Sequence, residues 1–543
     1  MRHAAGAPEA APLHGSAGRL RYLLPLLPSF VGLLIAAIVT GVTIRYATFV
    51  PWGTDSANYL TAARGWAAAD LFRPAPLDFS PLPWPDIGLP LAERHTRIRG
   101  ASTSMYPLGF PLFLAAGYLL HSEFGPYLVP PVLAGLLVWS TFLIANRLAG
   151  GWAGVIAAVL MALCPIALAH TVVTMSDVPA AGFFMLAIAM SIRGTATSAA
   201  AAGAAFAAAV MTRPVLAPLG IVPAALVLSG DTARLWPLRP LQWKKALLFC
   251  GLAALGPAMI LWSQKMLYGG FLTPGYVAFG TFFSRERIVG NLLMYPRNIS
   301  AVHTPLVALG LAGAVPLSRR LRHDDPRAAQ IIVALVAAAL MNYASYLPYL
   351  SFDTIWYTRF LLPAMAVMFV LLAAVTVHAA RALSRRSKVL AAACFVPAVI
   401  VPAAGRELFP FIFNTARSQE NIRQMGRYLD EVLPLNAAVV TFLQGGAVAY
   451  YTGAQIVRYD LIQPQMLEAT LDTLVRRGYH PVFLIDQEME GLGYKMQFAG
   501  TKYERLDWKP RAKFVAATTL WYLDYADRDG SLERKGVPTD ILH

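Results

Sequence analysis

The stretch VPWGTDSANY, residues 50–59, opens a long polar interruption directly after the first strongly apolar segment of the chain. The interruption continues through a section rich in proline and arginine and closes with YPLGFPL at residues 106–112. It contains Asp55, a lone acidic residue just outside the first apolar segment. An ionisable group at a membrane boundary is costly unless it is solvated or paired, so Asp55 is the first candidate for function.

The composition identifies a membrane protein. The chain has 543 residues, of which 57% are hydrophobic and only 14% are charged, and its mean hydropathy is +0.52. These values are too apolar for an ordinary soluble globule. The formal charge of +15 does not indicate a nucleic-acid partner, because Lys and Arg collect in short loops between apolar runs, as the positive-inside rule requires.

Apolar runs of about 17 to 25 residues predict membrane-spanning helices. Such runs lie near residues 23–48, 127–146, 151–170, 177–193, 196–211, 214–230, 246–265, 302–317, 329–350, 360–380 and 388–404. The expected fold class is therefore an α-helical polytopic membrane protein with about 11 transmembrane helices. The first run is too long for the core of a signal peptide, so we interpret it as an uncleaved span that follows a cytoplasmic tail, residues 1–22.

Basic loops predict the orientation of these spans. The loops at 234–245, 319–327 and 381–388 are rich in Lys and Arg and should face the cytoplasm. This scheme requires the short segment 106–120 to lie on the outer surface, and its prolines and aromatic residues suit an interfacial helix. Residues 50–125 then form the first extracytoplasmic loop of a transmembrane domain, residues 23–404.

The chain changes character after residue 404, where charged residues return. The pattern predicts helix 418–432, strand 437–443, a short helix 445–452, strand 455–459, helix 463–477, strand 481–486, helix 488–498 and a strand pair within 505–524. Strands that alternate with helices predict an extracytoplasmic α/β domain, residues 405–543, with a mainly parallel sheet. No GxGxxG or P-loop motif occurs in it, so we assign it no nucleotide.

A second lone acidic residue, Asp177, should lie at the same membrane face as Asp55. Each aspartate has a plain alternative as a helix cap, since Asp55 precedes Ser56 and Asp177 precedes Pro179. Two separate helix caps would account for the two aspartates one by one, whereas a single functional site between them accounts for both together.

Cations and aromatic residues near the same face are further candidates. Transfer of a sugar from a lipid phosphate needs a carboxylate near the acceptor and a cation near the leaving phosphate. The candidate cations are Arg359, Arg213 and Lys265, each of which could instead extend to the interface at the end of a span. Arg359 is favoured because aromatic and proline neighbours would hold it rigidly. Candidate substrate contacts are Tyr59, Tyr106, Arg97 and Tyr276, although Arg97 could be simply solvated and Tyr276 could lie in a plain turn.

Taken together, these motifs resemble the GT-C superfamily of membrane glycosyltransferases. The resemblance rests on the order of Asp55, YPLGFP at 106–111, SDVP at 176–179, YGGFLTPGY at 268–276 and RFLLP at 359–363, and it covers roughly residues 23–404. Within the superfamily, the chain looks most like the bacterial branch related to protein O-mannosyltransferases and lipid A aminoarabinose transferases. Two positions depart from these relatives. Ser56 stands where the mannosyltransferases carry Glu, and Met105 stands near where the aminoarabinose transferases have a Lys.

The resemblance implies an inverting transferase that uses a polyprenyl-phosphate sugar at the periplasmic face of the bacterial inner membrane. Asp55 takes the position of the catalytic carboxylate, Asp177 the second acidic position, and Arg359 a basic position near the donor phosphate. Expected partners are the donor, membrane lipid and a glycan, lipid or protein acceptor. The two acidic sites could hold a divalent cation, as in oligosaccharyltransferases, but two carboxylates make a poor cage, so the cation stays an open alternative and no metal ligands are assigned. The alternative function is a transporter or flippase of lipid-linked cell-envelope intermediates, although such proteins tend to carry repeats and midplane charges.

Overall fold

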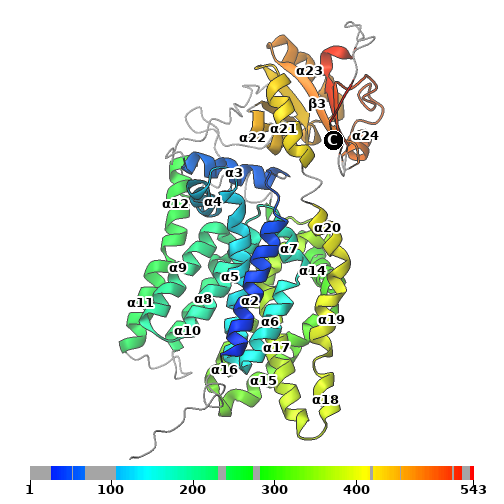
Figure 1. Cartoon of the computed structure of the whole chain (residues 1–543). Helices are drawn as coiled ribbons and strands as arrows, with labels where there is room; N and C mark the ends of the chain where they lie inside the picture. Colours follow the sequence, from blue (N-terminus) through cyan, green and yellow to red (C-terminus); the bar gives the residue numbers. More distant parts are fainter. Residues whose placement is uncertain are drawn as a thin grey trace, which may run out of the picture.

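The computed structural model describes residues 26–51, 53–67, 106–229, 240–268, 270–272, 282–415, 420–452, 454–488, 490–515, 519–528 and 539–542. Figure 1 shows a long bundle of helices with a smaller α/β unit at one end. Two short helices lie between the bundle and this unit.

Helices make up the bundle. Its first half contains α2 (Leu27–Arg45), α5 (Gly125–Ala149), α6 (Gly151–Ala162), α7 (Pro165–Val172), α8 (Asp177–Ser191), α9 (Ala196–Thr212), η1 (Pro214–Gly220), α10 (Ile221–Ser229), α11 (Pro240–Ala253) and α12 (Leu255–Tyr268). Its second half contains α14 (Arg287–His303), η3 (Pro305–Ala308), α15 (Leu309–Asp324), α16 (Pro326–Tyr346), η4 (Ile355–Leu361), α17 (Leu362–Ser384), α18 (Lys388–Ala393), α19 (Val396–Ala404), η5 (Gly405–Leu408) and α20 (Phe409–Asn414).

The chain is a multi-pass membrane protein by the length and apolarity of these helices. Within the described ranges, six helices are long and apolar enough to cross a membrane, or up to eight if each of two bent pairs is one span. The expected number of eleven is not confirmed, because four further apolar helices are shorter than 18 residues. One bent pair turns by 110° between α14 and the following helix, where the sequence had predicted the beginning of a straight span. The last candidate span, Lys388–Asn414, runs past residue 404, where we had expected it to end.

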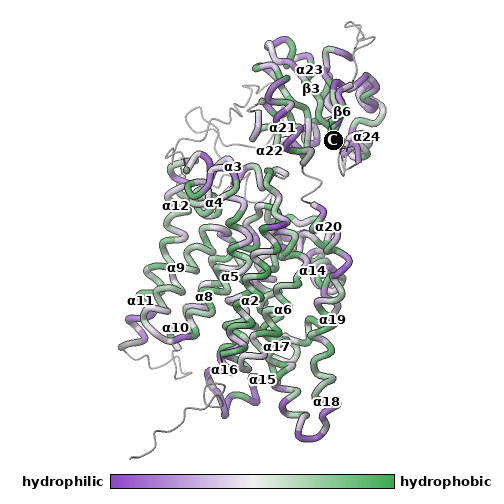
Figure 2. Tube along the Cα trace, in the orientation of Figure 1, coloured by the Kyte–Doolittle hydropathy of each residue, from purple (hydrophilic) through white to green (hydrophobic). Residues whose placement is uncertain are grey.

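Helix α17 forms the centre of the bundle. In the most apolar 18-residue stretch of its span, Ile355–Ser384, 94% is buried, and a helix that is apolar on every side must be covered by other helices. A charged residue lies at each end of this buried helix: Arg359 just before it and Arg381 in its last turn. Its 23 residues span roughly 35 Å at 1.5 Å per residue. Figure 2 shows hydrophilic residues at the end of the bundle near α15 and α18, opposite the α/β unit.

Helices α3 (Gly53–Ala67) and α4 (Gly109–Leu120) lie across the other end of the bundle (Figure 1). Their shared apolar cluster includes Leu60 from α3 and Phe110 from α4, both fully buried. The backbone of α4 approaches α9 so closely that a Cβ on Gly109 would lie 2.3 Å from the Met211 carbonyl carbon. Glycine at position 109 therefore allows α4, and Tyr106 just before it, to lie this close to α9.

The C-terminal unit is a mixed sheet covered by helices on both faces. Its described strands are β1 (Ala437–Thr441), β2 (Gln455–Arg458), β3 (His480–Asp486), β4 (Ala512–Val515), β5 (Thr519–Asp524) and β6 (Asp540–Leu542), in the order β2-β1-β3-β5-β4-β6. The pairs β1–β2, β1–β3 and β4–β6 are parallel, whereas β3–β5 and β4–β5 are antiparallel.

Two apolar clusters lie on opposite faces of this sheet. Helices α21 (Glu420–Val432) and α22 (Gly445–Thr452) cover one face, and α23 (Leu467–Arg476) and α24 (Gly491–Gln497) cover the other. The C-terminal α/β sheet predicted from the sequence is thus confirmed. Its pairing is less parallel than expected because β4 and β5 return as a hairpin. The boundaries assigned to the tail, the membrane domain and the C-terminal domain remain predictions.

Candidate functional site

Asp177 is a buried carboxylate at the first position of α8. Its side chain is fully buried and forms an ion pair with Arg213, with 2.7 Å between Oδ1 and Nη2. Arg213 directly follows α9 and ends that helix in extended backbone geometry. The N-terminus of α8 also favours a negative charge at this position. The capping interpretation of Asp177 is wrong, because Ser176 occupies the N-cap position of α8 and no side-chain cap hydrogen bond forms there.

Asp55 lies in the first turn of α3, which begins at Gly53 rather than at Ser56. Its side chain is 32% exposed, and Arg359 lies beside it with 3.4 Å between Nη2 and Oδ2. The Tyr106 hydroxyl donates a hydrogen bond of 2.5 Å to the other carboxylate oxygen, Oδ1. Asp55 is thus held at both oxygens while part of the carboxylate still faces solvent.

Arg359 joins the two aspartates into one cluster. Its Nε lies 3.9 Å from Asp177 Oδ1, while its Nη2 faces Asp55. Both arginines lie against the Phe360 ring, with guanidinium carbons 5.1 Å (Arg213) and 5.2 Å (Arg359) from its centroid. An aromatic face attracts cations, so Phe360 fixes both guanidinium groups on one side of the cluster.

The cluster balances two negative charges with two positive charges, but it leaves donors unused. Among the described residues, the Nε atoms of Arg213 and Arg359 are buried without a hydrogen-bond acceptor, and both carboxylate oxygens of Asp177 are buried without a hydrogen-bond donor. Buried donors of this kind are rare in proteins, and each one needs an explanation. Guanidinium groups bind carboxylates and phosphates in the same planar geometry. The cluster can therefore bind an anion in addition to its own carboxylates.

The remaining predicted site residues divide into three groups. Tyr59 is buried on α3, four residues after Asp55, and its hydroxyl lies 3.0 Å from Oγ of Ser176, the residue before Asp177. Lys265 lies exposed on α12 with its ammonium 5.8 Å from the Phe271 ring centroid, and within the described part of the chain it makes none of the ion pairs of the two aspartates. Arg97 and Tyr276 lie outside the described residues.

Two residues that the sequence analysis missed lie at the cluster. Tyr346 accepts a hydrogen bond of 3.4 Å from Arg213 and stacks on Phe360 with ring centroids 5.0 Å apart. His170 is buried near the charges of Arg359 and Asp177, and its Nδ1 bonds the Ile166 carbonyl oxygen at 2.8 Å. The only sequence signal for His170 was its polarity in an apolar run shortly before Asp177.

A divalent cation does not fit the groups at this site. Within the described ranges, no three His, Cys, Asp or Glu side chains lie together as metal ligands. The two carboxylates present are each paired with an arginine. A hard cation needs several oxygen ligands, and a guanidinium beside each carboxylate opposes a further positive charge.

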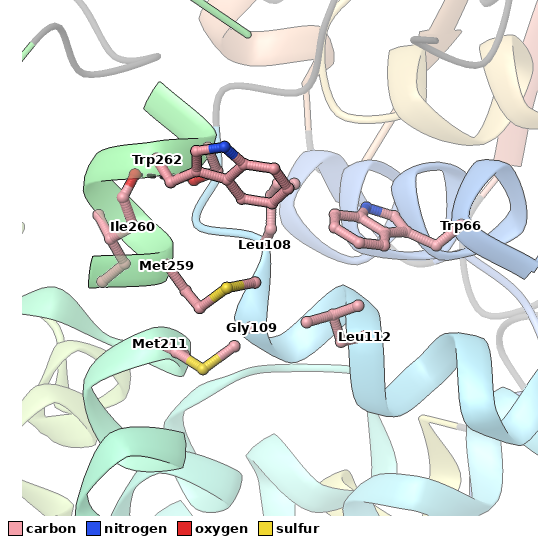
Figure 3. Close-up of a pocket in the computed structure, with 9 residues that line it drawn as sticks. Trp66, Leu108, Gly109, Leu112, Met211, Met259, Ile260 and Trp262 are labelled. Carbon is pink, nitrogen blue, oxygen red and sulfur yellow. Dashed lines mark hydrogen bonds between the residues drawn. The ribbon is translucent and has the colours of Figure 1, made fainter. Parts of the chain in front are cut away.

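A small apolar hollow lies between α3, α4, α9 and α12. Its cavity volume is about 10 Å³, and it is lined by Trp66, Leu108, Gly109, Leu112, Met211, Met259, Ile260, Trp262 and Ser263. Figure 3 shows the Trp66 and Trp262 rings above the methionines of α9 and α12. Met211, two residues before Arg213, lies near the end of α9.

No protein-family model matches the sequence, and no curated protein matches it. Solved structures do match. ArnT from Cupriavidus metallidurans in the apo state aligns with a TM-score of 0.52 and 13% identity over 94% of this chain and 98% of that one. The Archaeoglobus fulgidus oligosaccharyltransferase tethered with an acceptor peptide aligns with a TM-score of 0.52 and 11% identity over 90% of this chain and 74% of that one.

The Archaeoglobus fulgidus oligosaccharyltransferase AglB has also been solved in complex with an inhibitory peptide and a dolichol-phosphate. That structure aligns with a TM-score of 0.51 and 14% identity over 91% of this chain and 74% of that one. These neighbours are glycosyltransferases of the GT-C superfamily. The resemblance predicted from the sequence is confirmed at the level of the fold.

Proposed function

We propose that this chain is a GT-C-type glycosyltransferase of the bacterial inner membrane. It transfers a sugar from a polyprenyl-phosphate donor to a lipid, glycan or protein acceptor at the periplasmic face. The observation that carries the proposal is the convergence of Asp55 and Asp177, from different helices, on the same guanidinium of Arg359. The fold shared with solved oligosaccharyltransferase and ArnT structures supports it.

Asp55 is the catalytic carboxylate in this proposal. It is the more exposed of the two aspartates, so an acceptor hydroxyl can reach it. As the acceptor oxygen forms its bond to the anomeric carbon, Asp55 takes the hydroxyl proton, and the bond between that carbon and the phosphate oxygen breaks. The electron pair leaves with the polyprenyl phosphate. Attack from the face opposite the phosphate inverts the anomeric configuration.

Arg359 and Arg213 bind the donor phosphate in this scheme. Their buried Nε donors lack acceptors within the described chain, and a phosphate oxygen supplies them. The leaving phosphate gains negative charge during the reaction, so cations fixed beforehand stabilise the transition state more than the ground state. Asp177 keeps the two guanidinium groups in place while no donor is bound. A dolichol-phosphate in the AglB complex supports a polyprenyl carrier.

The apolar hollow beside Met211 offers a hydrophobic surface for contact with isoprene units of the carrier. Its lining is dominated by Trp, Met, Leu and Ile side chains, and burial of apolar surface there would be favourable. The hollow thereby supports a lipid-linked donor over a soluble sugar nucleotide.

The orientation of the bundle supports an extracytoplasmic site. Arg359 and Arg381 lie at opposite ends of α17. Short loops with several Lys and Arg residues mark the cytoplasmic side, and Arg381 begins one of the three basic loops, whereas Arg359 is a single basic residue. The cluster around Asp55 then faces the periplasm, and so does the C-terminal unit that lies on the same end of the bundle (Figure 1).

The test uses the purified chain in detergent, where no second compartment exists. Labelled sugar on a polyprenyl-phosphate donor is incubated with membrane acceptors, and transfer is measured for wild type, Asp55→Asn and Asp353→Asn. Asp353 is a matched control because it forms an exposed ion pair with Arg297. We expect transfer by wild type and the control, and a loss of about 10²- to 10⁴-fold in Asp55→Asn, the usual contribution of a general base.

Equal transfer by Asp55→Asn and wild type would remove Asp55 from catalysis. If the wild type transfers nothing in detergent but moves labelled lipid across vesicles, the chain is a flippase and not a transferase. Transfer should also persist in excess EDTA, because the donor set around Asp55 does not fit a divalent cation. A requirement for Mg²⁺ or Mn²⁺ would contradict that part of the proposal.

A further inference from the structure

The C-terminal unit contacts α3 at both ends, and α3 carries Asp55. Figure 1 shows α3 between the bundle and helices α21 and α22. Helix α22 packs against α3. The sequence of α3 is a poor helix former by itself, since GTDSANYLTAARGWA contains two glycines, two threonines and an asparagine. A short helix of this composition depends on tertiary contacts for its position.

The first contact lies just before α3. Val50 is 2% exposed and belongs to the apolar cluster on the α21 and α22 face of the C-terminal sheet. The preceding residue, Phe49, accepts a hydrogen bond of 3.3 Å at its carbonyl oxygen from Arg423 of α21. The linker that enters α3 is thus built into the core of the C-terminal unit.

The second contact lies near the other end of α3. The Arg64 guanidinium carbon lies 4.0 Å from the centroid of the Tyr450 ring of α22. The Tyr450 hydroxyl lies 3.0 Å from the hydroxyl of Tyr118 on α4. Tyr450 therefore links the C-terminal unit to α3 through its ring and to α4 through its hydroxyl.

These contacts lie before and after Asp55 along the chain, and Asp55 is the catalytic carboxylate of the proposed reaction. Asp55 and Arg64 lie on the same short helix, so a shift of α3 at Arg64 also shifts Asp55. Such a shift changes the distance from Asp55 to Arg359, which is fixed separately by η4 and the Phe360 ring. A displacement of about 1 Å at a catalytic group can cost about 100-fold in rate.

We propose that the C-terminal α/β unit positions the catalytic helix α3, with Val50, Arg64 and Tyr450 as positioning residues. This inference rests on the proposed function for the role of Asp55, but the contacts themselves do not. It gives the C-terminal unit a task in the reaction that acts through α3. A ligand that moved this unit would change the rate of transfer without touching the donor site.

The chain offers a matched control inside the same unit. Arg528 lies over the Tyr525 ring, with its guanidinium carbon 4.6 Å from the ring centroid, and the Tyr525 hydroxyl lies 3.2 Å from that of Tyr503. This arrangement repeats the chemistry of Arg64, Tyr450 and Tyr118, but it lies on the face of the sheet away from α21 and α22. Tyr525→Ala therefore removes a similar set of interactions from the same unit without affecting α3.

The experiment compares Tyr450→Ala, Tyr450→Phe and Tyr525→Ala in the full-length chain. Amide hydrogen exchange is followed in peptides that cover residues 53–67, and kcat and KM for the donor are measured. In Tyr450→Ala we expect exchange in α3 to rise about tenfold. We expect kcat to fall about tenfold while the donor KM stays within about twofold, because only the acceptor's base is displaced. Tyr450→Phe keeps the ring over Arg64, so exchange in α3 and kcat should both stay close to their wild-type values.

Unchanged exchange and unchanged kcat in Tyr450→Ala would overturn the proposal, as would equal effects in Tyr450→Ala and Tyr525→Ala. If Tyr450→Ala does not fold, Arg64→Gln and Arg64→Lys test the same contact from α3, with rescue expected only in Arg64→Lys. If the wild type transfers no sugar, the proposed function fails, and the exchange measurement alone then decides whether the C-terminal unit positions α3.

Discussion

Replacing Asp177 by Asn should destabilise the membrane domain, whereas the same change at Asp55 should leave its stability nearly unchanged. The Asp177 side chain is fully buried and is paired with Arg213 at 2.7 Å, with Arg359 3.9 Å away. Asn keeps the shape of the side chain but removes its charge. Among the described residues, Arg359 then keeps its ion pair with Asp55, whereas Arg213 loses its ion-pair partner.

The expected cost follows from this burial. Two charges about 4 Å apart interact by about 4 kcal/mol at an effective dielectric constant of about 20. Removing one partner of a buried ion pair typically costs about 3–5 kcal/mol, because the other charge stays buried and unpaired. Asp55 is 32% exposed, so loss of its pair with Arg359 should cost at most about 1 kcal/mol.

Thermal unfolding in detergent measures this difference directly. Asp177→Asn should unfold at a clearly lower temperature than Asp55→Asn, although both should lose transfer activity. The double variant Asp177→Asn/Arg213→Gln should be less destabilised than the sum of its single variants, because the second change removes the unpaired charge. The reasoning is refuted if Asp177→Asn and Asp55→Asn unfold at the same temperature, or if the double variant shows simple additivity.

Three further predictions concern single side chains. Tyr106→Phe removes the donor to Asp55 Oδ1 and should lower kcat by about tenfold to 100-fold, measured as steady-state transfer. Burial raises the pKa of Glu490 to about 7, so its protonated form is favoured in the folded state. Its contribution to stability is present below its ordinary pKa and is lost as the pH rises through about 7, and Glu490→Gln should flatten the unfolding temperature between pH 5 and 8. Gly109→Ala places a methyl group against the Met211 backbone and should cost about 1–3 kcal/mol by thermal unfolding.

Each of these has its own control. A Cβ on Gly41 of α2 meets no atom within 4 Å among the described residues, so Gly41→Ala should not destabilise the chain, and equal losses at both glycines would contradict the packing argument. A Tyr106→Phe variant with wild-type kcat would show that its hydrogen bond does not orient Asp55. A steep pH dependence that survives in Glu490→Gln would assign it to another group.

Much of the fold could be predicted from the sequence, because long apolar runs and strand periodicity are local signals. Helix α22 was predicted with its observed bounds, Gly445–Thr452. The structure differs from the prediction where the local sequence carries no pattern. The sharp bend after α14 occurs at Thr304, which has a left-handed φ of 58° and precedes a proline, and no apolar pattern indicates such a turn. Strand β6 has only three residues, Asp540–Leu542, too few for a periodic signal.

The charged part of the candidate site could also be found from the sequence. Asp55, Asp177, Arg213 and Arg359 were singled out as ionisable residues at one membrane face, and the structure brings them together. Their catalytic and binding roles remain predictions. Lys265 has the same chemistry and the same expected depth, yet it lies outside these ion pairs. Sequence position along a span fixes depth but not the direction around the bundle, so it could not separate Lys265 from the two arginines.

The contacts between α3 and the C-terminal unit could not be predicted at all. Arg64 and Tyr450 are far apart in the chain, and neither belongs to a motif. A lone Arg and a lone Tyr on short helices are ordinary surface residues until the two helices are placed side by side. The positioning role proposed for Arg64 and Tyr450 therefore rests on the tertiary packing alone.

The most direct test of the account is the release of free polyprenyl phosphate by the purified chain. A panel of synthetic polyprenyl-phosphate sugars is incubated with extracted membrane acceptors, for wild type and for Asp55→Asn, and the product's anomeric configuration is determined by NMR. The account predicts release by the wild type alone, with an inverted anomeric centre in the product. Release that is equal in Asp55→Asn, or a product with retained configuration, would contradict it.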